Sequence, residues 1–188
     1  KGPESHGQKV RHAEPGWGDS QSSENKPKCG DPIDMVTGSQ RMANTDFIVK
    51  ELGEDFRLVR IYESRYENKG GLLGSRWFLN IETRIWLEGE KAVAILPDMH
   101  LEHFIRTEHG WSNERSGAGI YRLTETDAGF CLALVRERIR YQYDRRGYLS
   151  MMIDRNDNRI WFRYLGSAIQ RMEFSCGQVL EFTYQDNK

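Results

Sequence analysis

Three short segments in the C-terminal half of the chain end in tyrosine at a nearly constant spacing. They are Ile139–Tyr143, Ile160–Tyr164 and Leu180–Tyr184, and each alternates apolar or aromatic residues with polar ones. The final tyrosines lie 21 and 20 residues apart, with Asp, Asn and Gly residues between them. Alternating runs separated by turn residues are typical of β-hairpins, and a repeat of about 20 residues indicates hairpins that stack on their neighbours to bury a core.

The residues between the tyrosines complete these hairpins. Shorter strands are expected at 149–153 and 169–174, with turns around 144–147, 156–158 and 176–177. A lone hairpin is marginal in water, and the sequence holds barely two full units. We therefore expect the array to be cut off, so that the functional object is larger than this chain. An exposed last strand at Leu180–Tyr184 would favour oligomers or aggregation of the isolated piece.

Strand patterns also occur upstream of the repeats. One parity of residues from Trp77 to Leu87 is mostly apolar, which predicts a single half-buried strand over these eleven residues. Runs at 92–96 and 101–105 follow turn residues and extend the pattern into a meander of hairpins. Phe56–Tyr62 predicts a further strand. The segment Asp46–Tyr66 also loosely fits a 3.6-residue period, so a helix is the alternative there.

Composition limits the class of protein. The 188 residues suit one domain or one and a half. The 27 basic and 28 acidic residues provide no global field for nucleic acid or a membrane surface. No apolar run approaches the roughly 20 residues that span a bilayer, and no signal peptide is visible. The three cysteines are Cys29, Cys131 and Cys176, whose wide spacing favours inert thiols in a reducing compartment.

The repeat segments resemble the YD repeats of the bacterial Rhs/YD-repeat family. In that repeat a Tyr-Asp pair is followed by a glycine turn, a polar turn and a strand ending in Tyr. Tyr143, Asp144 and Gly147 match this pattern, whereas Tyr164 and Tyr184 are not followed directly by Asp.

Upstream motifs extend the resemblance to residues 29–184. Rhs cores usually open with a module of four motifs, and this sequence has counterparts in the same order. They are Gly30-Asp31-Pro32 with Thr37-Gly38; Thr45-Asp46-Phe47; Arg60 with Tyr62 and Ser64; and Gly71 to Trp77 with Gly74, where Arg76 replaces the usual glycine. We therefore divide the chain into a polar linker or strap (1–28), an opening module of the Rhs core (29–110) and truncated YD-type hairpins (111–188).

The resemblance implies a mainly-β fold in which antiparallel hairpin repeats begin a curved, spiral β-shell, or cocoon. The implied function is structural: an N-terminal shell segment that helps to enclose a toxin carried at the C-terminus of the same polypeptide. Type VI secretion would deliver the assembly to competing or target cells. The chain would therefore lie in the bacterial cytoplasm before export, and afterwards be secreted or delivered to the target cell.

The implied partners are the remainder of the same polypeptide (shell and C-terminal toxin), a spike-tip or VgrG-type secretion component and a chaperone. The resemblance implies no enzyme activity, cofactor, metal, nucleic acid or membrane insertion for this segment. Structural roles would fall on Gly30, Asp31, Pro32, Thr37, Gly38, Arg60, Tyr62, Ser64, Gly71, Gly74, Trp77, Tyr143, Asp144, Gly147, Tyr164 and Tyr184.

Two alternative functions remain open at this point. One is a cell-surface adhesin or carbohydrate-binding module, with Trp111 or Trp161 as binding residues. The other is a small hydrolase that uses the cluster of His100, His103 and His109. On a strand, an offset of three residues places His100 and His103 on opposite faces, which disfavours a shared metal ion.

The basic residues Arg136, Arg138 and Arg140 would share one face of a strand. Glu137 and the balanced charge of the whole chain argue against a dedicated nucleic-acid site there.

Overall fold

The computed structural model describes residues 28–29, 33–34, 38–50, 54–67, 71–114 and 119–184. Every paired strand in these ranges is antiparallel, which confirms the expectation of a mainly-β fold built from hairpins. The described residues contain no α-helix, and none of them forms a helix that could cross a membrane. The helix considered for 46–66 is therefore wrong, because β3 (Arg41–Val49) and β4 (Phe56–Glu63) pair as a hairpin there.

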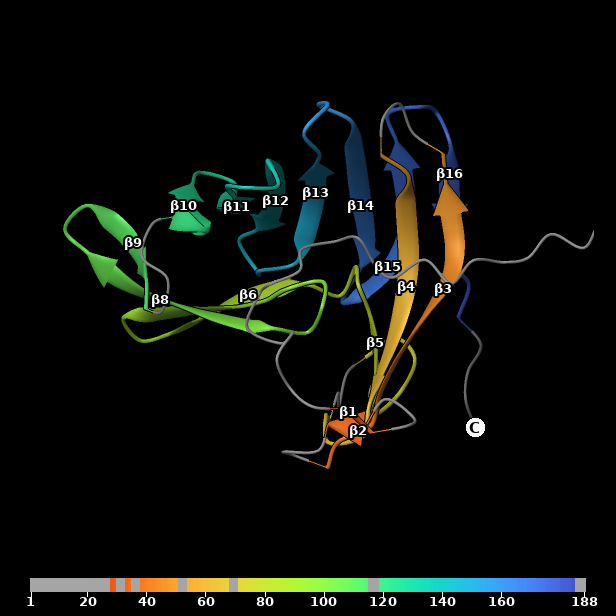
Figure 1. The fold of residues 1–188 in the computed structure, drawn as a ribbon. Helices are drawn as coiled ribbons and strands as arrows, with labels where there is room; N and C mark the ends of the chain where they lie inside the picture. The colour runs from red at the N-terminus through yellow and green to blue at the C-terminus, as the bar shows by residue number, and fades with distance from the viewer. Residues whose placement is uncertain are drawn as a thin grey trace, which may run out of the picture.

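Strands that follow one another along the chain are also neighbours in each sheet (Figure 1). A two-stranded ladder joins β1 (Lys28–Cys29) and β2 (Ile33–Asp34), and a three-stranded sheet joins β3, β4 and β5 (Trp77–Leu79). A four-stranded sheet contains β6 (Arg84–Glu88), β7 (Lys91–Ile95), β8 (Leu101–Thr107) and β9 (Gly110–Asn113). The largest sheet contains β10 (Tyr121–Thr126), β11 (Gly129–Leu134), β12 (Ile139–Asp144), β13 (Leu149–Ile153), β14 (Arg159–Leu165), β15 (Ala168–Phe174) and β16 (Val179–Glu181).

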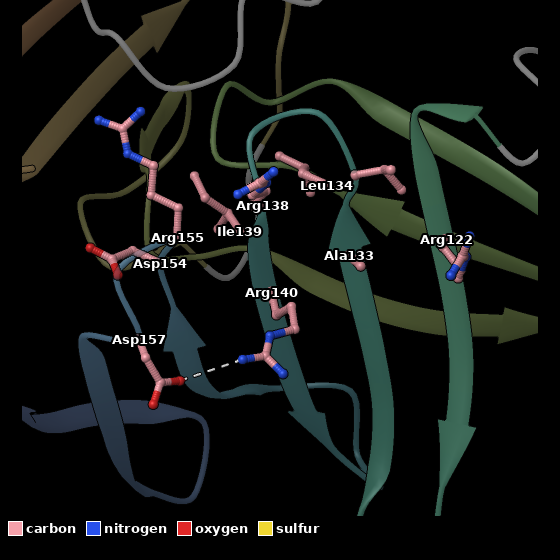
Figure 2. Close-up of a pocket in the computed structure, with 10 residues that line it drawn as sticks. Arg122, Ala133, Leu134, Arg138, Ile139, Arg140, Asp154, Arg155 and Asp157 are labelled. Carbon is pink, nitrogen blue, oxygen red and sulfur yellow. Dashed lines mark ion pairs between the residues drawn. The ribbon is translucent and has the colours of Figure 1, made fainter.

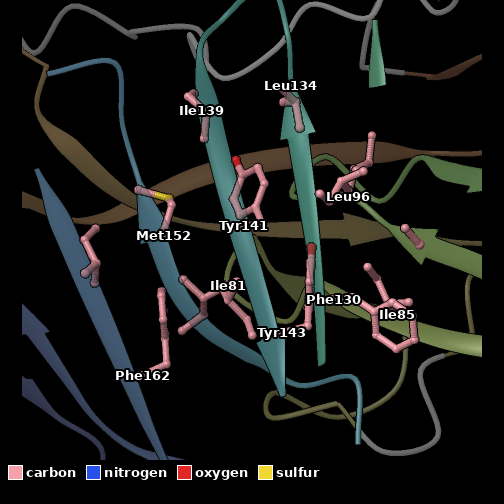
Figure 3. Close-up of a cluster of buried hydrophobic side chains, with 14 of the residues drawn as sticks. Ile81, Ile85, Leu96, Phe130, Leu134, Ile139, Tyr141, Tyr143, Met152 and Phe162 are labelled. Atoms are coloured by element: carbon pink, nitrogen blue, oxygen red, sulfur yellow. The ribbon is translucent and has the colours of Figure 1, made fainter. Parts of the chain in front are cut away.

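One face of the seven-stranded sheet packs on the three-stranded and four-stranded sheets. At one end the rings of Phe56 on β4 and Phe174 on β15 meet edge-to-face, with their centroids 5.3 Å apart. At the other end the Arg106 guanidinium on β8 lies 2.7 Å from the Glu125 carboxylate on β10. The buried core between these layers takes side chains from all three sheets, among them Ile81, Ile85, Leu96, Phe130, Leu134, Ile139, Tyr141, Tyr143, Met152 and Phe162 (Figure 3).

The strand predicted over 77–87 is wrong, because the chain forms β5, a turn and then β6. Asn80 and Glu82, which the alternation places on the solvent face, instead bond to backbone groups. The Asn80 amide accepts from Val59 N–H and donates to the Arg57 carbonyl, at 2.9 and 2.8 Å. The Glu82 carboxylate accepts from Leu79 N–H at 2.6 Å. These side-chain bonds stabilise the turn, so β5 and β6 lie in different sheets.

The repeat strands lie close to where the tyrosine spacing predicts them. β12, β13, β14 and β15 correspond to the expected strands at 139–143, 149–153, 160–164 and 169–174. The last strand is shorter than predicted, because β16 ends at Glu181. Beyond it the Phe182 N–H donates to the Gln170 carbonyl at 2.9 Å, and the Tyr184 hydroxyl donates to the Ile169 carbonyl at 2.6 Å, so contact with β15 continues past β16.

Candidate functional site

The Tyr-Asp motif forms the turn between β12 and β13. The Asp144 carboxylate accepts from Arg146 N–H and from Tyr148 N–H, both at 2.9 Å. The Gly147 N–H donates to the Asp144 carbonyl at 2.9 Å, and Gly147 has a φ of 80°. This is a three-residue hairpin loop closed by a residue in the left-handed conformation. The aspartate therefore holds the turn through its side chain, and the glycine supplies the backbone angle that the turn requires.

The same turn recurs three more times in the part of the chain that the structure describes. In each case the first residue pairs with the fifth, and the fourth residue has positive φ and donates to the first residue's carbonyl. The Asp154–Asn158 turn also uses an aspartate, whose carboxylate accepts from Asn156 N–H and Asn158 N–H. In the Leu96–His100 turn the aspartate is the third residue, Asp98, whose carboxylate accepts from His100 N–H at 3.0 Å. The Phe174–Gln178 turn forms without an aspartate. The backbone geometry thus repeats more faithfully than the sequence motif.

Gly147 also contacts the four-stranded sheet at close range. The Ile85 N–H on β6 donates to the Gly147 carbonyl at 3.0 Å. The backbones of Arg84 and Tyr148 form an isolated antiparallel β-bridge. A Cβ atom at Gly147 would lie 1.7 Å from the Ile85 carbonyl oxygen, a distance that no side chain can adopt. The backbone of the first repeat turn is therefore in direct contact with the backbone of β6.

Tyr143 joins the same two sheets through a buried chain of hydroxyl groups. Its hydroxyl lies 2.7 Å from Thr83 Oγ1, which donates to the Ile95 carbonyl at 2.5 Å. Since the threonine proton is used in that second bond, Tyr143 is the donor in the first. Burial raises the pKa of Tyr143 above its usual value, so the hydroxyl keeps its proton. Sequence reasoning missed Thr83, which carries no local motif.

The three repeat tyrosines lie in different environments. Tyr143 is fully buried, and Tyr164 is half-buried with its ring 5.3 Å from that of Tyr148. Tyr184 is 43% exposed. Burial also raises the pKa of Tyr164 above its usual value. The tyrosines therefore share a place in the repeat but differ in how much packing each contributes.

The predicted residues of the opening module lie around β3, β4 and β5, except that Gly30, Asp31, Pro32 and Thr37 fall outside the described residues. Arg60 pairs with Asp46 at 3.2 Å and lies over the Trp77 ring, 5.6 Å from its centre, and Tyr62 packs beside the same ring at 5.2 Å. Ser64 Oγ accepts from Gln40 N–H at 2.9 Å.

The glycines of this module lie in turns around the same sheet. Gly38 and Gly74 have positive φ, and Gly74 N–H donates to the Gly71 carbonyl. Arg76, which stands where the family pattern has glycine, also adopts a positive φ of 70°.

The histidines do not assemble into a common site. His100 Nε2 lies 2.8 Å from the buried Glu102 carboxylate, which also accepts from the Asn113 amide at 2.8 Å. His103 is half-buried on β8, whereas His109 is exposed in the following turn. Across the described ranges, no group of three or more His, Cys, Asp or Glu side chains is arranged to hold a metal ion. The arrangement therefore lends no support to the hydrolase alternative.

Among the described residues, two surface cavities are considered as candidate binding sites. The first, of about 490 Å³, lies where the three larger sheets meet and is lined by aromatic side chains that include Tyr66, Trp86, Tyr148 and Tyr164. The Arg84 guanidinium lies over the Tyr148 ring, 4.3 Å from its centre, at this cavity. Its volume falls in the range typical of small-molecule sites.

The second cavity, of about 360 Å³, lies on the opposite, outer face of the seven-stranded sheet and is rich in arginine (Figure 2). The expectation that Arg136, Arg138 and Arg140 share a strand face is wrong, because β12 begins at Ile139 and the first two lie in the preceding loop.

Of the cysteines, Cys131 is half-buried on β11 and Cys176 is exposed, and both are free. Burial raises the pKa of the Cys131 thiol, which makes it less reactive.

Comparison with known sequences covers part of this structure. The model of a family described as "Domain of unknown function (DUF6531)" matches residues 30–104, the segment from β2 to the middle of β8. No curated protein matches the chain. The matched segment contains Thr83 and Ile85, which contact Tyr143 and Gly147 in the repeats, so it shares its core with residues outside the match.

Proposed function

We propose that this chain is the N-terminal shell segment of an Rhs-type polymorphic toxin, which encloses a toxin carried at the C-terminus of the same polypeptide. The proposal rests on the resemblance of residues 29–184 to the Rhs core and its YD repeats. It gains support from the order of the seven-stranded sheet, in which each successive strand from β10 to β16 pairs with the one before it.

The recurring turn is the observation that carries the proposal. Asp144–Tyr148, Asp154–Asn158 and Phe174–Gln178 reverse the chain by the same pair of backbone bonds. A wall built in this way can be lengthened by repeating one local rule, because each new hairpin needs only its neighbour for support. The docking of Gly147 on Ile85 ties the first of these turns to the preceding module.

The mechanism is containment, and no residue is given a catalytic role. A closed β-wall leaves no free sheet edge and keeps the enclosed polypeptide away from solvent and proteases until delivery. Type VI secretion, with a spike-tip component and a chaperone, is the proposed route out of the producing bacterium.

The size of the native polypeptide tests this proposal. An antibody raised against residues 29–188 would be used to blot the producing bacterium, with and without protease inhibitors. We expect a band far larger than a 188-residue chain. A band of the size of this chain under both conditions would overturn the shell proposal.

The aromatic cavity favours a second candidate function, a surface adhesin or carbohydrate-binding module. Trp86 lines that cavity, whereas Trp161 lies half-buried on β14 and Trp111 lies beneath the Arg106 guanidinium. A glycan array probed with the chain and with Trp86→Ala separates the two functions. Saturable binding that disappears with Trp86→Ala supports the adhesin, and the same binding lost only with Trp161→Ala would move its site to the outer face.

A further inference from the structure

A row of three residues crosses the outer face of the seven-stranded sheet. Arg122 on β10 pairs with Ala133 on β11, which pairs in turn with Arg140 on β12. Since neighbouring strands lie about 4.8 Å apart, the two arginine backbones are about 10 Å apart, with the smallest side chain between them. Figure 2 shows Ala133 between the strands that carry the two arginines. Because the Ala133 side chain is small, the space above it stays open, and Ala133 lines the cavity there.

Two more guanidinium groups line this cavity. Arg138 precedes β12 and adopts a positive φ of 58°, and Arg155 lies in the turn between β13 and β14. A non-glycine residue in the left-handed region costs about 1–2 kcal/mol, and such strain is concentrated at functional sites. Four arginines from two strands, a loop and a turn therefore line one cavity.

The acidic residues at the cavity do not neutralise this charge. The lining contains four arginines and two aspartates, a surplus of two positive charges, although the whole chain has a net charge of −1. The Asp154 carboxylate is already occupied by N–H groups of Asn156 and Asn158. Asp157 is shared between Arg140, at 3.5 Å, and Arg159, at 3.1 Å. Arg155 pairs with Glu54, outside the lining, at 3.9 Å. Within the described ranges, no carboxylate lies within ion-pair distance of Arg122 or Arg138.

A second pair of arginines on the same face has carboxylates beside it that compensate its charge. Arg163 on β14 and Arg171 on β15 are direct cross-strand partners. Glu173 lies 3.7 Å from Arg163 and 3.1 Å from Arg171, and Glu181 lies 3.6 Å from Arg171. Like charges on adjacent strands are destabilising unless a counter-charge intervenes. Both arginines of that pair have carboxylate partners, whereas in the row at Ala133 only Arg140 has one, Asp157.

From this contrast we propose that the cavity over Ala133 binds a phosphate group. Guanidinium groups donate N–H pairs that match the oxygens of oxyanions, and several of them can share one tetrahedral phosphate. A carboxylate has two oxygens and one charge, and so satisfies fewer donors than a phosphate with close to two charges. The surplus of two positive charges in the lining fits the phosphate dianion.

The experiment titrates the 188-residue chain with inorganic phosphate at constant ionic strength, followed by calorimetry. We expect saturable binding of one phosphate per chain, weakened about tenfold or more in Arg122→Gln/Arg140→Gln, because each charge-assisted hydrogen bond contributes more than the 1.4 kcal/mol that equals a factor of ten. Ala133→Leu fills the gap without changing any charge and should weaken binding as well. The matched control is Arg163→Gln/Arg171→Gln, which removes the same charge from the same face and should leave binding unchanged.

The outcomes separate the site from general electrostatics. The proposal is overturned if phosphate does not bind saturably, or if both double variants lose the same phosphate affinity. Circular dichroism of each variant checks that the chain remains folded. A second titration uses an oligothymidylate. If it binds more tightly than phosphate and also requires Arg122 and Arg140, the phosphate belongs to a nucleic-acid backbone. If it does not bind, the ligand is a small phosphorylated molecule.

Discussion

The hydroxyl of Tyr143 lies 2.7 Å from Thr83 Oγ1, although the two residues are 60 positions apart in the sequence. Thr83 precedes β6 and Tyr143 belongs to β12, so this bond joins two different sheets inside the core. A buried hydroxyl that loses its partner carries the full cost of its desolvation. The repeat tyrosine is therefore a specific attachment point as well as a large apolar side chain.

Tyr143→Phe tests this attachment. Removal of the hydroxyl leaves an acceptor position on Thr83 Oγ1 without a donor, and we expect the free energy of unfolding to fall by about 1–2 kcal/mol. Urea unfolding followed by fluorescence measures the change. Tyr62→Phe is the control, because it keeps the ring that packs against Trp77 at a tilt of 59°. We expect this substitution to cost less than half as much. Equal losses in the two variants would contradict the attachment.

Gly147→Ala tests the close approach of the first repeat turn to β6. Gly166 is the matched control, since both glycines have positive φ but a Cβ at Gly166 meets no atom within 4 Å. We expect Gly166→Ala to cost about 1–2 kcal/mol, the usual penalty of the left-handed conformation. Gly147→Ala adds a clash with the Ile85 carbonyl and should cost at least about 3 kcal/mol more, within the range of severe core disruptions.

Thermal unfolding of the two glycine variants, each compared with the unmodified chain, measures this difference. Similar midpoints for Gly147→Ala and Gly166→Ala would show that only the backbone angle matters, and would remove the docking contact from the description of the junction.

Asp144→Ala tests the contribution of the Tyr-Asp aspartate to its turn. The substitution removes the acceptor for Arg146 N–H and Tyr148 N–H, and by analogy with capping side chains it should destabilise the fold by about 1–2 kcal/mol. The turn should still form, because Phe174–Gln178 makes the same backbone bonds without an aspartate. Asp127→Ala, in the exposed turn between β10 and β11, should change chemical-denaturation midpoints little. A larger effect at Asp127 would refute this ranking.

Arg76→Gly is expected to stabilise the protein. Arg76 has a φ of 70° and an exposed side chain, and its backbone carbonyl accepts from Glu63 N–H. Glycine removes a penalty of about 1–2 kcal/mol but adds about 0.4–1 kcal/mol of unfolded-state entropy. The net gain should be about 0.5–1 kcal/mol, read from the shift of the urea midpoint at constant slope. A loss of stability would mean that the arginine side chain makes a favourable contribution of its own.

High pH should unfold the chain through its buried tyrosines. Burial raises the pKa of Tyr121 to about 12, and it also raises the pKa values of Tyr141 and Tyr143 above the usual 10. Above pH 10 the unfolded chain releases these protons while the folded chain retains them. The contribution of these tyrosines to the free energy of unfolding is therefore fully present below pH 10, and it decreases as the pH rises towards 12. Urea midpoints between pH 8 and 11.5 test this, and a midpoint that stays constant above pH 10 would contradict it.

The strands of the repeat region could be predicted because their signal is local. Alternation with period two and turn residues at Asp144 to Gly147 and at Asp154 to Asn158 specify where each strand ends. Even the Arg122–Ala133–Arg140 row follows from local information once the lengths of the turns at 127–128 and 135–138 are known, because turn length sets register. The pattern of any single strand does not show the row, because its three residues belong to three different strands.

The remaining features depend on contacts between distant segments. The alternation from Trp77 to Leu87 predicts one strand, yet Asn80 bonds to Val59 and Arg57 and divides it. Gly147 looks like an ordinary turn glycine until β6 places the Ile85 carbonyl against it. By itself the sequence determined the repeat strands β12 to β15 and the turns between them, because those follow from periodicity and turn residues. Only the tertiary structure decided which backbones meet, because buried hydrogen-bonding groups must find partners wherever the packed sheets bring them together.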